Sequence, residues 1–235
     1  KAVYRLLLRS ISCMFYALYE QLAAINLFEW AGLVSGLLCV WLLIKQNIWT
    51  WPIGLVYSLV SLAVFMQTKL YSEFVLHIYY AGMNAYGWYY WSRSDPQDAS
   101  LELPVARTDR LTGAVLFVTV AICVPLLAEF MQQFTDTDMA YADSTITILS
   151  FAAMWMTARK LIENWYIWLL VDIIATGVYI IKGIELYALL YCIYIGMALA
   201  GLVAWRASLL SRQQLQVETG PDSNHGDEKP VRVPL

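Results

Sequence analysis

Apolar stretches long enough to cross a bilayer follow one another along most of this chain, separated by short polar segments. A membrane-spanning helix needs about 20 mostly apolar residues. The charges gather between the stretches rather than along one face of each, so burial in a soluble core explains the pattern less well. The pattern predicts seven spanning helices, at residues 28–44, 51–67, 73–91, 111–131, 142–158, 165–181 and 184–205.

Two of the short connections resemble each other. "TKLYS" joins the second and third predicted helices, and "KGIELY" joins the sixth and seventh. Superimposing Leu70 on Leu186 gives an offset of 116 residues, which also pairs Trp49 with Trp165. A gap of two residues then aligns "AGMNAYGWYYW" with "IGMALAGLVAW". The first three predicted helices therefore recur as the last three.

The fourth predicted helix is left as a connector, so the second unit has the same orientation as the first. Such parallel repeats are related by a pseudo-twofold axis along the membrane normal, and transporters of this kind bind substrate between the repeats. We predict an all-α integral membrane protein with a 3+1+3 plan. Its parts are an N-terminal amphipathic helix in the membrane interface at 1–25, the first three-helix repeat at 26–91, loops and connector helix at 92–140, the second repeat at 141–206 and a disordered polar tail at 207–235.

Composition agrees with a membrane protein and narrows the function. Hydrophobic residues make up 60% of the chain and charged residues 14%, outside the range of ordinary soluble domains. The net charge of -3 offers no basic surface for nucleic acid. The four cysteines lie in apolar segments without CxxC spacing, which favours small hydrophobes over disulfides or metal ligands. Because GxSxG, HExxH and phosphate-binding glycine loops do not occur, we expect neither an enzyme nor a metal or cofactor site.

Polar and aromatic side chains form a stripe along the third predicted helix. His77, Tyr80, Asn84, Trp88 and Trp91 follow one another at three or four residues, so they share one face. Lipid does not satisfy the hydrogen-bonding groups of such a face. The stripe is therefore expected to face other helices.

A second stripe of the same kind runs along the sixth predicted helix, where Asn164, Trp168, Asp172 and Thr176 are four residues apart. Two facing stripes would line a slot. Aromatic walls stack on flat rings and stabilise a cation by about 0.5–2 kcal/mol. Amides and a carboxylate recognise hydroxyl and carboxamide groups. The expected ligand is a flat, polyhydroxylated small molecule, with or without a positive charge.

For several of these residues a structural role competes with binding. Asn84 and Asp172 lie within helices, where an unpaired polar group is costly, so we favour binding over structural hydrogen bonding. His77 suits helix packing equally well, and Gln67 lies close enough to a helix end to reach the interface. Tryptophans at helix ends fit an aromatic belt at the membrane surface better than a ligand contact, and these are Trp49, Trp51, Trp91, Trp165 and Trp205.

Four motifs together carry a resemblance to a known family. "WTWPIG", "YYAGMNAYGWYYW", "ENWYIWLLVD" and "GIELYALLY" resemble the PnuC family of bacterial nicotinamide riboside transporters, across residues 30–205. The resemblance implies a plan like that of the SWEET sugar transporters, a location in the bacterial inner membrane and a homotrimer. It also implies uptake of nicotinamide riboside, an NAD precursor, by facilitated diffusion. A cytoplasmic kinase would then trap the nucleoside by phosphorylation.

The same resemblance places the substrate site on "ENWYIW" and "AGMNAYGW". It implies that Trp168 stacks on the ligand while Asn84 and Asn164 hydrogen-bond its ribose or carboxamide. Helical phase adds five further candidates, which are Asp172, Tyr80, Trp88, Gln67 and Thr147.

Two alternatives to nicotinamide riboside uptake remain open at this point. Related members of the family carry thiamine or riboflavin, which are also flat and polar, so one stripe pattern suits all three ligands. A membrane sensor or scaffold that does not transport is the second alternative.

Overall fold

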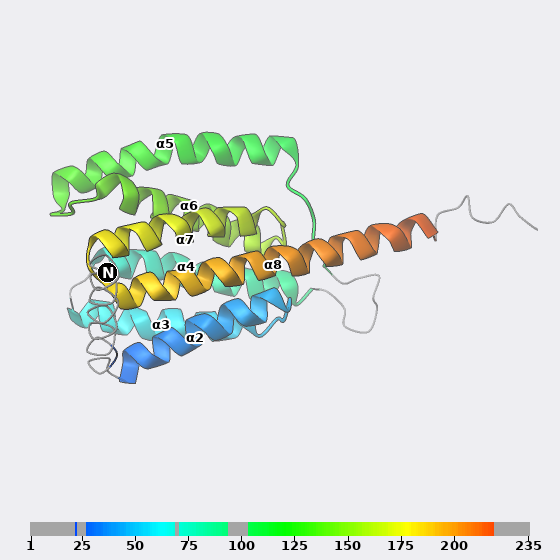
Figure 1. The fold of residues 1–235 in the computed structure, drawn as a ribbon, viewed down its shortest axis with the longest axis horizontal. Helices are drawn as coiled ribbons and strands as arrows, with labels where there is room; N and C mark the ends of the chain where they lie inside the picture. The colour runs from blue at the N-terminus through cyan, green and yellow to red at the C-terminus, as the bar shows by residue number, and fades with distance from the viewer. Residues whose placement is uncertain (1–21, 23–26, 69–70, 94–102, 219–235) are drawn as a thin grey trace, which may run out of the picture.

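The computed structural model describes residues 22, 27–68, 71–93 and 103–218, and within them it contains seven α-helices and no strand. The helices lie side by side along one common direction, and α8 extends beyond the others at one end (Figure 1). Each predicted helix coincides with an observed one, so the all-α fold is confirmed. The helices are α2 (Leu27–Ile44), α3 (Thr50–Thr68), α4 (Tyr71–Trp91), α5 (Arg110–Phe134), α6 (Ala140–Ala158), α7 (Asn164–Ile181) and α8 (Glu185–Glu218).

Length and hydropathy mark three of these helical segments as candidate membrane spans, Arg110–Phe134, Asn164–Ile181 and Glu185–Gln214. Two further apolar segments, Trp30–Ile44 and Thr50–Leu62, are shorter. The predicted amphipathic helix at residues 1–25 lies outside the described residues, apart from Leu22. The described helices therefore support a helical membrane protein.

The helices pack as two groups of three. In the first helix group α3 packs on both α2 and α4, and in the second helix group α7 packs on both α6 and α8. The two groups meet where α2 lies against α8 and where α4 lies against α6. These two seams hold the first and second helix groups together.

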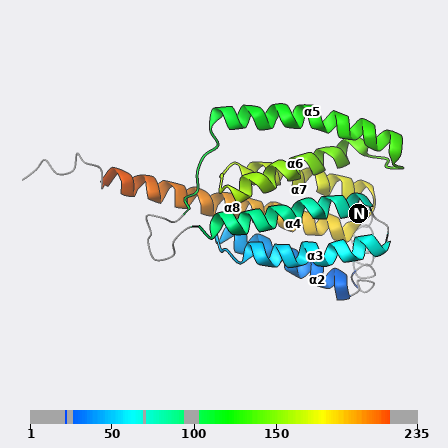
Figure 2. The ribbon, with the colours of Figure 1, turned by 180° about the vertical axis from the view of Figure 1, so that it is seen from behind.

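Helix α5 lies on the outside of the bundle, against α6 (Figure 2). Ala128 is its buried residue, whereas Leu111, Phe117 and Phe134 are each about 70% exposed. A helix with so much exposed apolar surface fits contact with lipid or with another apolar surface.

The loops after α2 and α6 have the same local structure, 114 residues apart. Gln46 and Lys160 both adopt left-handed backbone angles, with φ of 54° and 53°. The Gln46 N–H donates to the Leu43 carbonyl at 2.9 Å, and the Lys160 N–H donates to the Thr157 carbonyl at 3.0 Å. A left-handed residue at this position ends a helix and satisfies its last carbonyls.

The residue that matches Trp165 is Trp51, and the pairing of Trp49 with Trp165 is wrong. Trp51 and Trp165 lie at equivalent positions after the two loops. The backbone N–H of each donates to the carbonyl three residues earlier, at 3.2 and 3.3 Å. Trp165 is 2% exposed, like Trp51, whereas Trp49 is 63% exposed. The offset at this loop is therefore 114 residues, the same as between "AGMNAYGWYYW" and "IGMALAGLVAW".

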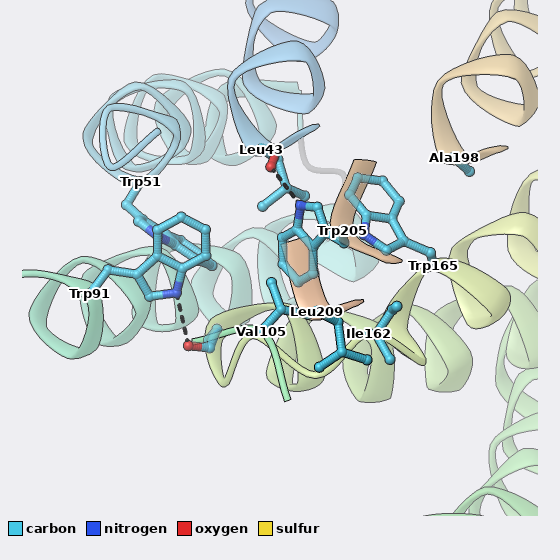
Figure 3. Close-up of a cluster of buried hydrophobic side chains, with 10 residues drawn as sticks. Leu43, Trp51, Trp91, Val105, Ile162, Trp165, Ala198, Trp205 and Leu209 are labelled. Atoms are coloured by element: carbon cyan, nitrogen blue, oxygen red, sulfur yellow. Dashed lines mark hydrogen bonds between the residues drawn. The ribbon is translucent and has the colours of Figure 1, made fainter. Parts of the chain in front are cut away.

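Four tryptophans form a buried cluster next to the loops after α2 and α6 (Figure 3). They are Trp51, Trp91, Trp165 and Trp205, here called the tryptophan cluster. Each is at most 4% exposed. The Trp51 and Trp91 rings meet edge to face with centroids 5.3 Å apart, and Trp165 and Trp205 do so at 5.4 Å.

Assigning these four tryptophans to an interfacial belt is therefore wrong. Gly87 of α4 and Gly201 of α8 explain why. A Cβ added at Gly87 would lie 2.5 Å from the Trp51 ring, and a Cβ at Gly201 would overlap the Trp165 ring in the same way. Small residues let an indole pack directly on a neighbouring helix, where it buries a large apolar area.

The cluster also connects the two helix groups by crossed hydrogen bonds. The Trp91 Nε1–H donates to the Ala158 carbonyl at 3.0 Å, and the Trp205 Nε1–H donates to the Leu43 carbonyl at 3.1 Å (Figure 3). Both acceptors lie in the last turn of a helix, where carbonyls lack intrahelical partners. Each group thus donates one indole N–H to the first helix of the other group.

Helix α8 continues to Glu218, so the disordered tail expected from residue 207 does not begin there. Leu209 is buried in the same core as Val105 and Ile162. The Gln46 side chain donates to the Ser208 hydroxyl at 2.9 Å. These contacts hold the helix beyond its apolar part, and residues 219–235 lie outside the described residues.

Candidate substrate site

Asn84 lies in α4 with 6% of its surface exposed. Its Nδ2 donates to the Tyr80 carbonyl at 2.8 Å and to the Ser58 hydroxyl of α3 at 3.4 Å. A Cβ at Gly54 would overlap the Asn84 amide, so the amide lies directly on the bare backbone of α3. In this conformation Asn84 makes the structural hydrogen bonds that compete with its proposed role in binding.

Asn164 is the first residue of α7 and is completely buried. Its Nδ2 donates to the Leu161 carbonyl in the preceding loop. Its Oδ1 is buried without a hydrogen-bond donor among the described residues. A buried acceptor left unpaired costs about 1–3 kcal/mol, so this oxygen is the site's clearest unfilled acceptor.

Trp168 follows Asn164 by one helical turn. Its Nε1–H donates to the Thr157 hydroxyl of α6 at 3.1 Å. The hydrogen bond fixes one edge of the indole, and the residue remains partly exposed. Such fixing orients a ring for stacking without an entropic penalty on binding.

Asp172 follows Trp168 by another turn of α7 and is 6% exposed. Its carboxylate is close enough to the hydroxyls of Tyr191 and Tyr194 in α8 to interact with both electrostatically. Tyr191 interacts in the same way with Tyr80 of α4. Members of the two predicted stripes, Tyr80 and Asp172, thus approach one tyrosine from different helix groups.

The remaining candidates are less well placed. Trp88 is 44% exposed. The Thr147 hydroxyl donates to the Asp143 carbonyl of its own helix at 2.9 Å. The Gln67 side chain lies outside the described part of the structure. His77 packs its ring near Tyr57 and Tyr80, with centroids 6.0 and 5.7 Å away, which fits its helix-packing alternative.

Sequence reasoning missed Tyr191 and Tyr194. Tyr194 lies 114 residues after Tyr80, and Tyr191 lies 114 residues after His77. The internal repeat could therefore have identified both tyrosines as counterparts of stripe residues. A Cβ added at Gly36 would lie 2.6 Å from the Tyr194 hydroxyl, so Tyr194 extends from α8 to α2. It therefore connects the two helix groups at the level of the polar side chains.

The chemistry of this region is binding by hydrogen bonds and aromatic faces. Among the residues that the structure describes, no group of three histidine, cysteine, aspartate or glutamate side chains is placed to hold a metal ion. Apolar helices that enclose buried amides, a carboxylate and tyrosines define the class of a multi-pass membrane protein with a polar site between its helices.

The comparisons with known proteins identify the family. The family described as nicotinamide mononucleotide transporter matches residues 26–207, so the chain belongs to it. The chain is 28% identical over 207 residues to the nicotinamide riboside transporter PnuC of Escherichia coli, covering 78% of this chain and 87% of that protein. The resemblance to the PnuC family is confirmed.

Two further similarities bear on fold and substrate. The riboflavin/roseoflavin transporter RibM of Streptomyces davaonensis is 24% identical over 178 residues, covering 75% of this chain and 83% of RibM. The crystal structure of the vitamin B3 transporter PnuC matches with a TM-score of 0.64 at 17% identity, over 84% of this chain and 90% of that one. The protein is thus a membrane transporter and not an enzyme.

Proposed function

We propose that this protein takes up nicotinamide riboside across the bacterial inner membrane by facilitated diffusion. The observation that carries the proposal is that Asp172 of α7 and Tyr80 of α4 both interact with Tyr191 of α8, with Trp168 one helical turn before Asp172. An indole, a carboxylate and phenol hydroxyls at neighbouring helical turns suit a flat, hydroxylated molecule. The Escherichia coli relative, whose name gives nicotinamide riboside as its substrate, supports the same choice.

In this proposal Trp168 stacks on the nicotinamide ring while Asn84 and Asn164 hydrogen-bond the ribose or the carboxamide. The unpaired Oδ1 of Asn164 supports its part, because a hydroxyl or amide N–H of the substrate would satisfy it. For Asn84 the proposal requires its bond to Ser58, at 3.4 Å the longer of its two, to be exchanged for one to substrate. Asp172 and Tyr80 complete the proposed site, while Trp88, Gln67 and Thr147 stay predictions.

The proposal includes the 3+1+3 plan, with α2–α4 and α6–α8 as parallel repeats and α5 as the connector. Its support is the set of contacts that recur 114 residues apart, in the loops after α2 and α6 and in the tryptophan pairs. Two such repeats can rock against each other around a site between them, which gives alternating access. The crossed indole hydrogen bonds would hold one end closed in this conformation.

The homotrimer and the trapping of the nucleoside by a cytoplasmic kinase belong to the proposal through the family resemblance. The exposed apolar surface of α5 supports a further apolar contact, with lipid or a neighbouring copy. Uptake without ion coupling requires a separate reaction to hold the substrate inside, and phosphorylation supplies it because a charged phosphate does not leave through the same site.

Riboflavin is the second candidate substrate, because the relative RibM is a riboflavin/roseoflavin transporter. The test is uptake by the protein in liposomes, with nicotinamide riboside, thiamine and riboflavin compared in the absence of any ion gradient. Accumulation of nicotinamide riboside to its external concentration and no further supports facilitated diffusion. Uptake of riboflavin or thiamine alone would replace the substrate, and calorimetric binding without uptake would favour a sensor.

A further inference from the structure

Asp172 is a buried acid that is not paired with a basic side chain among the described residues. It lies in the middle of α7 with 6% of its surface exposed. Its carboxylate forms no ion pair with a lysine, arginine or histidine among the described residues, whereas Asp143, at the start of α6, lies 3.8 Å from the Lys182 ammonium. An ionised carboxylate shielded from water is costly unless a positive charge or several hydrogen bonds compensate it.

The nearest polar side chains do not supply that compensation in this conformation. The Thr176 hydroxyl, one turn further along α7, donates to the backbone carbonyl of Asp172 at 2.7 Å. Tyr191 and Tyr194 interact with the carboxylate electrostatically, and neither hydroxyl donates a hydrogen bond to it. From the described residues, therefore, the negative charge receives no counter-charge.

Aromatic side chains of the same region add to the negative potential. Trp168 lies one turn before Asp172 on the same face of α7. Tyr191 stacks on Tyr179 with centroids 5.3 Å apart and meets Tyr194 edge to face at 5.8 Å. The faces of aromatic rings attract cations. A carboxylate next to such rings is the combination that binds a flat ring with a delocalised positive charge.

The corresponding position of the first helix group is neutral. Ser58 lies 114 residues before Asp172, and its hydroxyl donates to the Gly54 carbonyl at 2.8 Å. An acidic side chain is thus present at this level on α7 and not at the matching position of α3. A substrate with one charged end would bind with that end towards the second helix group.

We infer that Asp172 selects substrates whose flat ring carries a positive charge, such as a pyridinium nucleoside, over neutral flat molecules of similar size, such as flavins. The inference rests on the proposed function, because the ring of nicotinamide riboside is a pyridinium cation. It adds that charge, and not shape alone, decides which vitamin precursor is carried. The ribose end then lies towards Asn84.

The experiment compares two nucleosides that differ in ring charge: nicotinamide riboside and its reduced form, whose dihydropyridine ring is neutral. Uptake of each is measured with the full chain in liposomes. We expect the wild-type protein to prefer the cation by about tenfold in kcat/KM, within the range of charge–aromatic and ion-pair recognition. Asp172→Asn, which removes the charge and keeps the shape, should bring the ratio to about one by weakening uptake of the cation. Asp172→Glu should retain the preference.

Asp136→Asn is the matched control, because it removes an exposed carboxylate in the loop between α5 and α6. It should leave the ratio at its wild-type value. A wild-type ratio near one, or an Asp172→Asn protein that keeps the wild-type ratio, would overturn the inference while leaving nicotinamide riboside uptake in place. A wild-type ratio near one would overturn the inference even if Asp172→Asn does not fold. Uptake of riboflavin and of neither nucleoside would instead refute the proposed function.

Discussion

The two helix groups contribute the same residues to the tryptophan cluster but different residues to the polar region next to it. In the tryptophan cluster, residues 114 apart are identical and make the same contacts. Trp51 and Trp165 each lie on a glycine of the neighbouring helix, and Trp91 and Trp205 each donate to the other group. The two groups contribute equally to this end of the bundle.

Within the next one to two helical turns, the side chains of the two groups differ at several positions. At the same offset, Gly54 corresponds to Trp168 and Ser58 corresponds to Asp172. Asn84 corresponds to Ala198. One group therefore supplies an amide and bare backbone, and the other supplies an indole and a carboxylate.

The difference has a physical reason. Where two similar helix groups pack against each other, the same contacts can form on both sides, because the two surfaces that meet are alike. A nucleoside has a flat ring at one end and a sugar at the other, so its site gains affinity only when the two sides offer different groups. The equal tryptophans therefore belong to the contact between the groups, and the unequal pairs Ser58/Asp172 and Asn84/Ala198 belong to the candidate site, where Tyr80 and Tyr194 are alike.

The largest expected effect tests the equality of the two sides. Gly87→Ala and Gly201→Ala each place a Cβ against an indole ring, so each should lower the free energy of unfolding by about 2 kcal/mol or more, and by similar amounts. Thermal unfolding of the purified proteins in detergent measures this.

Gly82→Ala and Gly196→Ala are the matched controls for these variants. They are 114 residues apart as well, and a Cβ at either meets no atom within 4 Å. Both should unfold close to the wild-type temperature. If Gly87→Ala were tolerated and Gly201→Ala were not, the two sides of the seam would not be equivalent.

The next prediction tests the difference between the two helix groups in the polar region. Trp168→Ala should weaken nicotinamide riboside binding by about 1–3 kcal/mol, the range for stacking of a base on an aromatic side chain, while the protein stays folded. Calorimetry gives the affinity. Trp49→Ala, which removes a tryptophan that is 63% exposed, should bind as the wild type does. Unchanged affinity in Trp168→Ala would remove Trp168 from the site.

Smaller effects are expected from the crossed hydrogen bonds. Trp91→Phe removes the indole donor to the Ala158 carbonyl and should cost about 1 kcal/mol. Trp205→Phe should cost less, because the Leu43 carbonyl keeps the Gln46 backbone N–H as a donor at 2.9 Å. Unfolding free energies of the two single variants and the double variant measure this. If the bonds hold one end closed, the same variants should also change transport rate more than substrate affinity, and equal changes in both would argue against that role.

The smallest effect concerns Thr147. Because its hydroxyl donates to the Asp143 carbonyl of its own helix, Thr147→Val should change the affinity for nicotinamide riboside by less than about twofold. Competition binding against labelled substrate detects such a difference. A tenfold loss would show that this hydroxyl turns towards the substrate and would support the predicted place of Thr147 in the site.

Hydropathy placed six helices and the start of α8 to within a few residues, because a stretch of apolar residues long enough to span a bilayer has few other stable conformations. It failed for the C-terminal end of α8, where the sequence turns polar. There Leu209 packs on Val105, a residue about a hundred positions away, and no local pattern predicts that contact.

The prediction of a membrane-surface belt was wrong for the buried tryptophans. A tryptophan near a helix end looks the same in the sequence whether it faces lipid headgroups or a neighbouring helix. Glycines at positions 87 and 201 decide the matter in the structure, because they leave room for the rings of Trp51 and Trp165. Tyr194 aligns with Tyr80 in the same repeat, but only the structure shows that it extends to Gly36 and interacts electrostatically with Asp172.

The sequence by itself determined the class of protein, the helices and the family, because hydropathy and short motifs are local properties of the chain. It also selected Asn164, Trp168 and Asp172 as polar residues of one helix face. Only the tertiary structure decided which tryptophans form the seam, which tyrosines approach Asp172 and which hydrogen bonds Asn84 already makes. These depend on which helices meet and at what height, and that is fixed by side-chain packing between different helices, which no local pattern in the sequence specifies.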